Sequence, residues 1–143
     1  MAFKFEKLEV WKLALEYLDL IYEIAEILPP SENYNLRSQI TRAGTSITLA
    51  IAEGSTGQTD AEQARFLGIG IRSVVETVAC LHIIHRRKYV PEADLLRRTY
   101  AHAELLFGKL FAMRKKLDPD QKWVREDTNP YSVEAEYDNP FSH

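Results

Sequence analysis

Apolar residues recur at three- and four-residue spacing through most of the chain, a period that predicts α-helices. The expected helices cover residues 6–28, 36–53, 60–88 and 91–117. Pro29-Pro30 cannot continue the first helix, Gly54 is a natural stop for the second, and Pro91 suits the first turn of the fourth. Short connections favour antiparallel neighbours. We therefore predict an all-α fold, an up-down-up-down antiparallel four-helix bundle over residues 1–117.

The junction between the second and third helices carries a charge in an unusual place. Thr59-Asp60-Ala61-Glu62 has the pattern of a capping box and starts the third helix. Glu53 ends the second helix, where the helix dipole favours a cation. Because the two helix ends meet in the bundle, we expect Glu53 to clasp the turn and to pair with Arg65. A second pair, Arg42 with Glu76, is expected at similar height. A catalytic acid at Glu53 is the alternative, but no second catalytic group is evident.

The first helix has two apolar stripes. One consists of Leu8, Trp11, Leu15, Leu18, Tyr22 and Ala25. The other consists of Val10, Ala14, Tyr17, Ile21, Ile24 and Leu28. A helix in a lone bundle needs a single apolar face, so the second stripe predicts self-association. The expected subunit interface is formed by Val10, Ala14, Tyr17, Ile21 and Ile24. A broad core face is the alternative.

The net charge of −3 conceals an asymmetry. Residues 118–143 contain seven acidic and two basic side chains, so this tail carries −5 and the rest of the chain +2. The tail has three prolines and no sustained period, which predicts an extended or disordered segment. Its aromatic residues Tyr131, Tyr137 and Phe141 offer docking groups for a partner, and a loose tail is the simpler alternative.

Basic residues cluster at one end of the predicted bundle. Arg86, Arg87 and Lys88 end the third helix, and Arg97 and Arg98 lie early in the fourth. These five side chains are the candidate site for weak binding of RNA or DNA, through sequence-independent phosphate contacts that salt would weaken. The alternative is a structural role, because cations near a helix C-terminus favour its dipole and solvate the surface.

Catalytic and metal chemistry is not expected. No Glu is followed by His three positions later, the pattern of a di-iron bundle, and the three helical histidines His82, His85 and His102 lie in unpromising surroundings. Cys80, the only cysteine, lies within an apolar helical pattern that predicts a buried, inert thiol. We therefore expect no enzymatic activity, metal or cofactor. With no signal peptide and no apolar run near the roughly 20 residues of a membrane span, we expect a cytoplasmic protein without membrane contact.

Several short motifs resemble a known bacterial family. They are Leu8-x-Val10-Trp11, Gln39-x-x-Arg42-Ala43-x-x-Ser46-Ile47, Ile51-Ala52-Glu53-Gly54 and Arg65-Phe66-Leu67. Residues 3–117 are similar to the four helix bundle proteins, encoded within intervening sequences of large-subunit ribosomal RNA genes and often labelled ribosomal proteins. A related branch is the accessory variability determinant proteins of diversity-generating retroelements.

The resemblance implies a homopentameric ring of four-helix bundles without enzymatic activity. Nucleic-acid binding is attributed mainly to the basic retroelement branch. Three helix positions depart from the family pattern, Thr48 for Pro, Ala50 for Asn and Arg72 for Gly, and the acidic tail departs from the basic branch. The resulting expectation is a non-enzymatic homo-oligomer associated with nucleic acid. The alternative is an oligomeric scaffold for a protein partner, without nucleic-acid binding.

Overall fold

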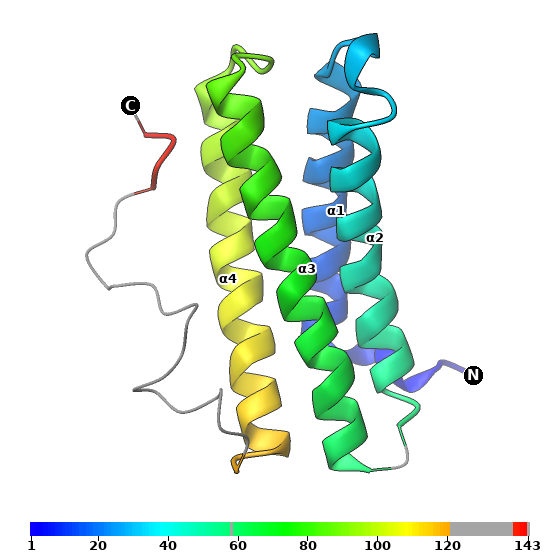
Figure 1. Cartoon of the computed structure of the whole chain (residues 1–143). Coiled ribbons are helices and arrows are strands. Elements are labelled where there is room, and N and C mark those ends of the chain that lie inside the picture. The colour runs from blue at the N-terminus through cyan, green and yellow to red at the C-terminus, as the bar shows by residue number, and fades with distance from the viewer. Residues whose placement is uncertain (58, 121–138, 143) are drawn as a thin grey trace.

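Four long helices make up the described part of the chain, which in this computed structural model comprises residues 1–57, 59–120 and 139–142. The helices are α1 (Glu9–Ile27), α2 (Leu36–Gly54), α3 (Asp60–Arg86) and α4 (Ala93–Leu117). Two short 3-10 helices, η1 (Lys4–Lys7) and η2 (Pro30–Glu32), precede α1 and α2. Successive long helices run antiparallel (Figure 1), and no strand occurs among these residues. The predicted all-α, up-down-up-down bundle is confirmed.

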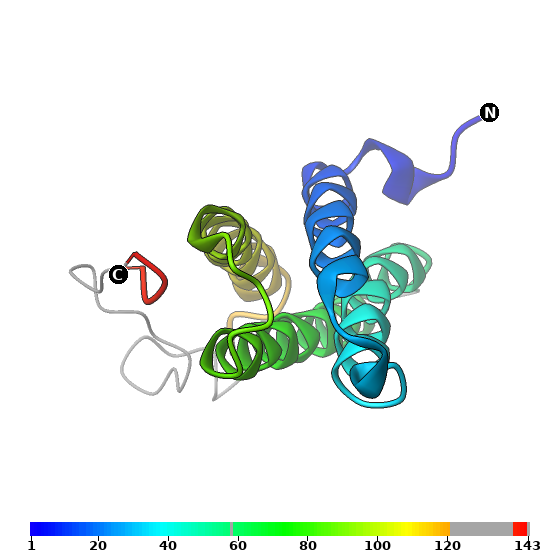
Figure 2. The same ribbon diagram turned by 90° about the horizontal axis from the view of Figure 1, so that it is seen from above.

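The four helices surround one core. Each packs against its neighbours along the chain, and α1 closes the arrangement against α4. Seen along the bundle, the α1–α2 and α3–α4 connections lie at the near end (Figure 2). The α2–α3 connection lies at the opposite end (Figure 1). The end of α3 and the start of α4 therefore share one end of the bundle with the turn that precedes α2.

Local chemistry sets the helix ends. The Thr59 hydroxyl accepts a hydrogen bond from the Glu62 amide at 3.1 Å, which confirms Thr59 as the N-cap of α3. At the other end of α3, Lys88 adopts a left-handed conformation with φ 61°. The Lys88 amide donates to the His85 carbonyl at 3.0 Å, and the Tyr89 amide to the Ile84 carbonyl at 3.3 Å. These two bonds form a Schellman motif, so α3 ends two residues earlier than expected.

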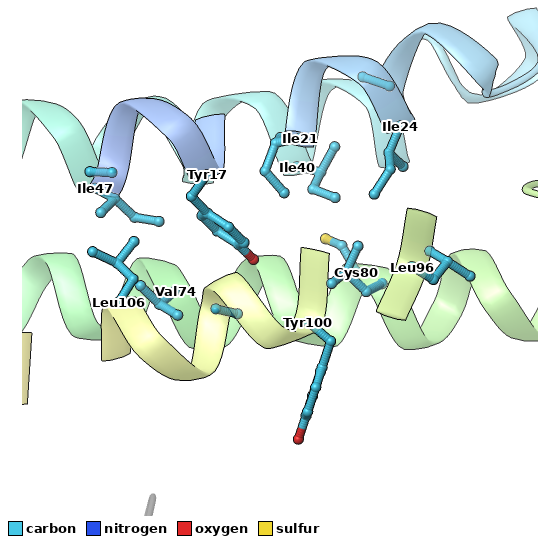
Figure 3. Packing of buried hydrophobic residues seen from close by; sticks show 14 of the residues in the cluster. Tyr17, Ile21, Ile24, Ile40, Ile47, Val74, Cys80, Leu96, Tyr100 and Leu106 are labelled. Carbon is cyan, nitrogen blue, oxygen red and sulfur yellow. The ribbon is translucent and has the colours of Figure 1, made fainter. Parts of the chain in front are cut away.

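The apolar stripe expected at a subunit interface belongs instead to the core of the chain itself. Val10, Ala14, Tyr17, Ile21 and Ile24 are each at most 6% exposed. Tyr17, Ile21 and Ile24 point from α1 toward the other helices (Figure 3). The reason is that α1 packs against both α2 and α4, which directs this stripe to the centre of the bundle. The interface assignment is therefore corrected.

The other stripe of α1 is the one left partly uncovered. Leu15 is 40% exposed and Tyr22 48%. Leu8, Trp11 and Leu18 are half-buried. Two apolar stripes are thus present as predicted, but the one that faces outward is not the one expected at the interface.

Small residues bring the helix pairs close together. A Cβ added to Gly44 of α2 would lie 3.0 Å from Leu18 Cδ1 of α1. A Cβ added to Gly68 of α3 would lie 2.7 Å from a guanidinium nitrogen of Arg114 in α4. Arg114 is 5% exposed, and its burial lowers the pKa of its guanidinium to about 10. Glycine at position 68 thus makes room for a buried arginine, although the basic run at the end of α4 would suggest a surface position.

The apolar character of α3 reflects its place in the core. Among the described helices, α3 is long and apolar enough to cross a bilayer by length and composition, with a mean hydropathy of 1.6 over its most apolar window. More than half of that window, 56%, is buried inside the bundle. A central helix with this burial passes the same test as a membrane span, so the test gives weak support for a membrane segment.

Only part of the tail prediction falls on described residues. Tyr131 and Tyr137, like most of the segment expected to be extended or disordered, lie outside them. Phe141 lies within them and is fully buried beside α3 and α4 of the same chain.

Candidate nucleic-acid interface

The five basic residues predicted to bind phosphate do gather at one end of the bundle. Arg86, Arg87 and Lys88 lie where α3 ends, and Arg97 and Arg98 lie in the first turns of α4. Arg97 is half-buried and the other four are exposed. Their positive charges are unequally available, because acidic side chains lie beside some of them.

The negative charge of Asp94 partly neutralises the two arginines Arg97 and Arg98 of α4. Its Oδ2 lies 3.0 Å from Arg98 Nε and its Oδ1 lies 3.4 Å from Arg97 Nη2. The hydrogen bond from Arg98 is the main cause that lowers the pKa of the Asp94 carboxyl, and Arg97 adds to it. Both arginines are thus partly neutralised within their own helix.

The negative charge of Glu32 lies close enough to Arg87 to offset part of its positive charge. Its carboxylate is buried in the turn before α2 and accepts hydrogen bonds from Asn35 Nδ2 at 2.8 Å and from the Tyr89 hydroxyl at 3.2 Å. The Asn35 bond is the largest cause that lowers the pKa of the Glu32 carboxyl, and the nearby positive charge of Arg87 contributes as well. Glu32 therefore stays ionised close to Arg87.

The remaining basic side chains surround a surface cavity. A cavity of about 510 Å³ is lined by His82, His85, Arg86 and Lys88. Within the described chain, neither Arg86 nor Lys88 forms an ion pair. Arginine and lysine donors beside two imidazoles suit a phosphate group, which accepts several charge-assisted hydrogen bonds.

Of the five predicted residues, only Arg86 and Lys88 line the cavity. His82 and His85 line it as well and were not in the predicted site. On sequence grounds, His82 is weighed only as a metal ligand, and His85 both as a metal ligand and as the first residue of the basic run 85–88. The signal that points to them is their spacing on α3, because His82 lies four residues before Arg86, on the same helix face, and His85 directly precedes Arg86.

The clasp predicted around Glu53 does not form. Among the described residues no ion pair joins Glu53 to Arg65 or Arg42 to Glu76, and all four side chains are exposed. The Arg65 guanidinium lies 4.6 Å from the centre of the Phe66 ring.

The physical reason is that the groups Glu53 was expected to bond have other partners: the Thr59 hydroxyl caps the start of α3, and the Arg65 guanidinium lies over the Phe66 ring. The carbonyls at the end of α2 are satisfied locally. The Ser55 hydroxyl donates to the Ala52 carbonyl and the Thr56 hydroxyl to the Glu53 carbonyl, each at 2.7 Å. A cross-helix clasp exists at the other end of α2, where Arg37 Nε donates to the Ala25 carbonyl at 2.8 Å and Arg37 Nη2 donates to the Leu28 carbonyl. This arginine supplies the positive charge that the C-terminus of α1 favours.

Glu53 and Arg42 instead belong to an outer groove between α1, α2 and α3. The groove measures about 500 Å³. Its walls include the apolar side chains of Tyr22, Leu49 and Ile69, which are 48%, 51% and 37% exposed. Arg42 and Glu53 line the same groove about three helical turns apart on α2.

The described residues bring together no group suited to metal or nucleophilic chemistry. Within them, no three His, Cys, Asp or Glu side chains could hold a metal ion. Cys80 is 6% exposed, and burial, followed by the charge of Glu76, raises the pKa of its thiol to about 11. Such a thiol is almost wholly protonated at neutral pH and is a poor nucleophile.

Comparison with known proteins places this fold. No protein of curated function matches the chain. A crystal structure from Bacteroides thetaiotaomicron, of a protein with unknown function from the S23 ribosomal protein family, superposes with a TM-score of 0.68 at 23% sequence identity. The match covers 74% of this chain and 98% of that protein, and at this identity it shows the shared fold alone. The model of the 23S rRNA-intervening sequence protein family matches residues 6–108. The chain belongs to the family of 23S rRNA-intervening sequence proteins.

Proposed function

We propose that this protein is a non-enzymatic, cytoplasmic homo-oligomer, pentameric as the family resemblance implies, that associates with nucleic acid through phosphate contacts. The observation that carries the proposal is the cavity lined by His82, His85, Arg86 and Lys88. Its two exposed cations have no acidic partner among the described residues, whereas the neighbouring arginines do. Structured RNA is the first ligand to test, because the name of the family refers to 23S rRNA intervening sequences.

The shape of the chain at Lys88 favours a binding role over a purely structural one. A lysine at φ 61° is strained, and glycine would occupy this Schellman position at lower cost. Strain that persists in a native structure is often associated with function. Lys88 lines the cavity, where a glycine would contribute no charge.

Self-association would strengthen a weak site. A ring of subunits repeats the cavity, so one nucleic acid can engage several copies at a high effective concentration. The outer groove is the surface we assign to a second copy of the chain. It combines three exposed apolar side chains with Arg42 at one point and Glu53 at another, so the Arg42 end of one copy can face the Glu53 end of the next, head to tail as a ring requires.

A titration of labelled structured RNA, followed by fluorescence anisotropy at two salt concentrations, tests the nucleic-acid proposal. We expect saturable binding that weakens steeply with salt, and loss of binding in the double variant Arg86→Glu, Lys88→Glu. The double variant Lys7→Glu, Lys12→Glu changes the net charge by the same amount and is the matched control, because both lysines are exposed near the N-terminus and do not line the cavity. Absence of binding at low salt would overturn the proposal and favour an oligomeric scaffold for a protein partner. Equal losses in the control would mean that the cavity is not the site.

A further inference from the structure

The C-terminal segment Asn139–Ser142 docks on the same end of the bundle as the basic cavity. In Figure 1 this segment, drawn in red, lies beside the N-terminal part of α4. Its anchor is Phe141, whose exposed fraction is 0%. The Phe141 ring centre lies 5.0 Å from that of His82, 5.1 Å from that of His85 and 5.7 Å from that of Tyr100. We call these three rings, contributed by α3 and α4, the aromatic socket.

Polar contacts fix the backbone of the anchor. Asn139 Nδ2 donates to the Arg97 carbonyl at 3.0 Å, and the Phe141 amide donates to Asn139 Oδ1 at 3.0 Å. The Ser142 amide also donates to the Asn139 carbonyl at 3.1 Å. Pro140 restricts its own φ angle, so the turn loses little entropy on docking. The bundle thus holds a shaped Asn-Pro-Phe turn, and its contacts go beyond burial of a single ring.

The socket and the basic cavity share two side chains. His82 and His85 contact the Phe141 ring and also line the cavity. Asn139 binds the backbone of Arg97, one of the basic residues at this end. A ligand that reoriented either imidazole toward a phosphate would therefore disturb the anchor.

The tail that ends in the docked turn is strongly acidic. Residues 118–143 carry −5, and Asp138 directly precedes the docked turn. The chain leaves α4 at Leu117, at the end of the bundle opposite to Arg97, and is held again at Asn139. Docking of the turn therefore fixes the point at which the acidic tail ends, Asn139, at the basic end of the molecule.

We propose that the aromatic socket is a peptide-binding site whose ligand is the Asn139-Pro140-Phe141 turn of the same chain, and that the docked tail competes with nucleic acid for the basic cavity. The first part stands on the contacts of Phe141 and Asn139. The second part rests on the proposed function, since it needs a nucleic acid that binds the cavity.

A peptide-binding measurement tests the socket by itself. The probe is a fluorescein-labelled peptide of residues 134–143, titrated with the full-length Phe141→Ala protein. We expect saturable binding about tenfold or more tighter than to the wild-type protein, whose socket is filled by a tethered turn at millimolar effective concentration. A peptide with alanine in place of the phenylalanine is the control and is expected not to bind. Equal binding to wild type and variant, or no binding to the variant at about millimolar peptide, would overturn the socket.

An RNA titration then tests the competition. Phe141→Ala leaves the net charge unchanged, so a change in affinity reports release of the tail. We expect the variant to bind labelled structured RNA about three- to tenfold more tightly than wild type at low salt, where an acidic competitor matters most. Asn139→Ala, which keeps the ring but loses two hydrogen bonds, should fall between them. Circular dichroism of both variants checks that the helical bundle is intact.

The outcomes separate the two proposals. If the peptide binds and RNA affinity is the same in both proteins, the socket stands and the competition is wrong. If neither protein binds RNA, the proposed function fails and the competition fails with it, while the peptide titration still decides the socket.

Discussion

The hydroxyl of Tyr17 in α1 and the hydroxyl of Thr77 in α3 lie 2.7 Å apart in the fully buried centre of the bundle. Thr77 donates its own proton to the Val74 carbonyl at 2.6 Å, so Tyr17 is the donor to Thr77. Burial raises the pKa of the Tyr17 phenol above its usual value, and the phenol therefore stays protonated. Figure 3 shows the Tyr17 ring crossing the core from α1 toward α3.

This chain of hydrogen bonds predicts unequal effects for two conservative changes. Thr77→Val removes the acceptor of a buried phenol and should lower the free energy of unfolding by about 1–3 kcal/mol. Tyr17→Phe leaves Thr77 bonded to Val74 and should cost only about 0.5–1.5 kcal/mol. The double variant should be no less stable than Thr77→Val alone. Urea unfolding of the three proteins measures this, and a larger loss for Tyr17→Phe than for Thr77→Val would contradict the assignment of the donor.

The helices were predictable from the sequence because their apolar period and stop signals are local. The choice between two stripes of α1 was not, since both have the same spacing and only the packing against α2 and α4 decides which one is buried. The Glu53 clasp failed for a related reason. The Thr59 hydroxyl capped the start of α3 and Arg65 lay over Phe66, while the real clasp came from Arg37, whose sequence context gives no sign of its reach to α1.

The candidate site was predictable in position and not in detail. Basic residues at the end of α3 and the start of α4 must meet in any up-down bundle, so their gathering followed from topology. The pairing of Asp94 with Arg97 and Arg98 follows helical spacing and was missed, whereas the contacts of Glu32 with Tyr89 and of Phe141 with its aromatic socket join distant segments. Contacts between segments far apart in the chain leave no periodic signal in the sequence.

Glu32 makes stability depend on pH. Its folded-state pKa lies below the ordinary value of 4.5, so its contribution is present above about that pH and is lost as the pH falls through the lower folded value. We expect the urea midpoint of the wild-type protein to fall between about pH 5 and pH 3, and Glu32→Gln to flatten part of that fall. The Asp94 carboxyl, shifted in the same direction by Arg98, accounts for a residual slope. Glu26→Gln, an exposed change on α1, is the control and should keep the wild-type profile.

The outer groove can be tested as a subunit contact by reversing the charges of Arg42 and Glu53. If Arg42 of one copy faces Glu53 of another, Arg42→Glu or Glu53→Arg alone places like charges together and should weaken association about tenfold, or ~1.4 kcal/mol. The double variant should restore it. Sedimentation velocity over a range of concentrations measures the effect. A wild-type protein that stays monomeric, or a double variant no better than the singles, would remove this groove as the interface.

Substitution of Lys88 is expected to change stability and RNA binding in opposite directions. Lys88→Gly relieves the left-handed strain at the end of α3 and should raise the free energy of unfolding by about 0.5–1 kcal/mol. The same change removes a cation from the cavity and should weaken RNA binding, with the slope of log affinity against log salt reduced by about 0.9 if one phosphate contact is lost.

Two further variants identify the cause of that change. Lys88→Asn tolerates the left-handed conformation without a charge and should bind RNA as weakly as Lys88→Gly. Lys88→Arg keeps the charge and should retain binding. Thermal unfolding and anisotropy on the same preparations provide both readouts. Because the glycine variant is expected to be more stable than wild type, its loss of binding could not be attributed to unfolding. Unchanged binding in both neutral variants would instead show that Lys88 serves only to end the helix.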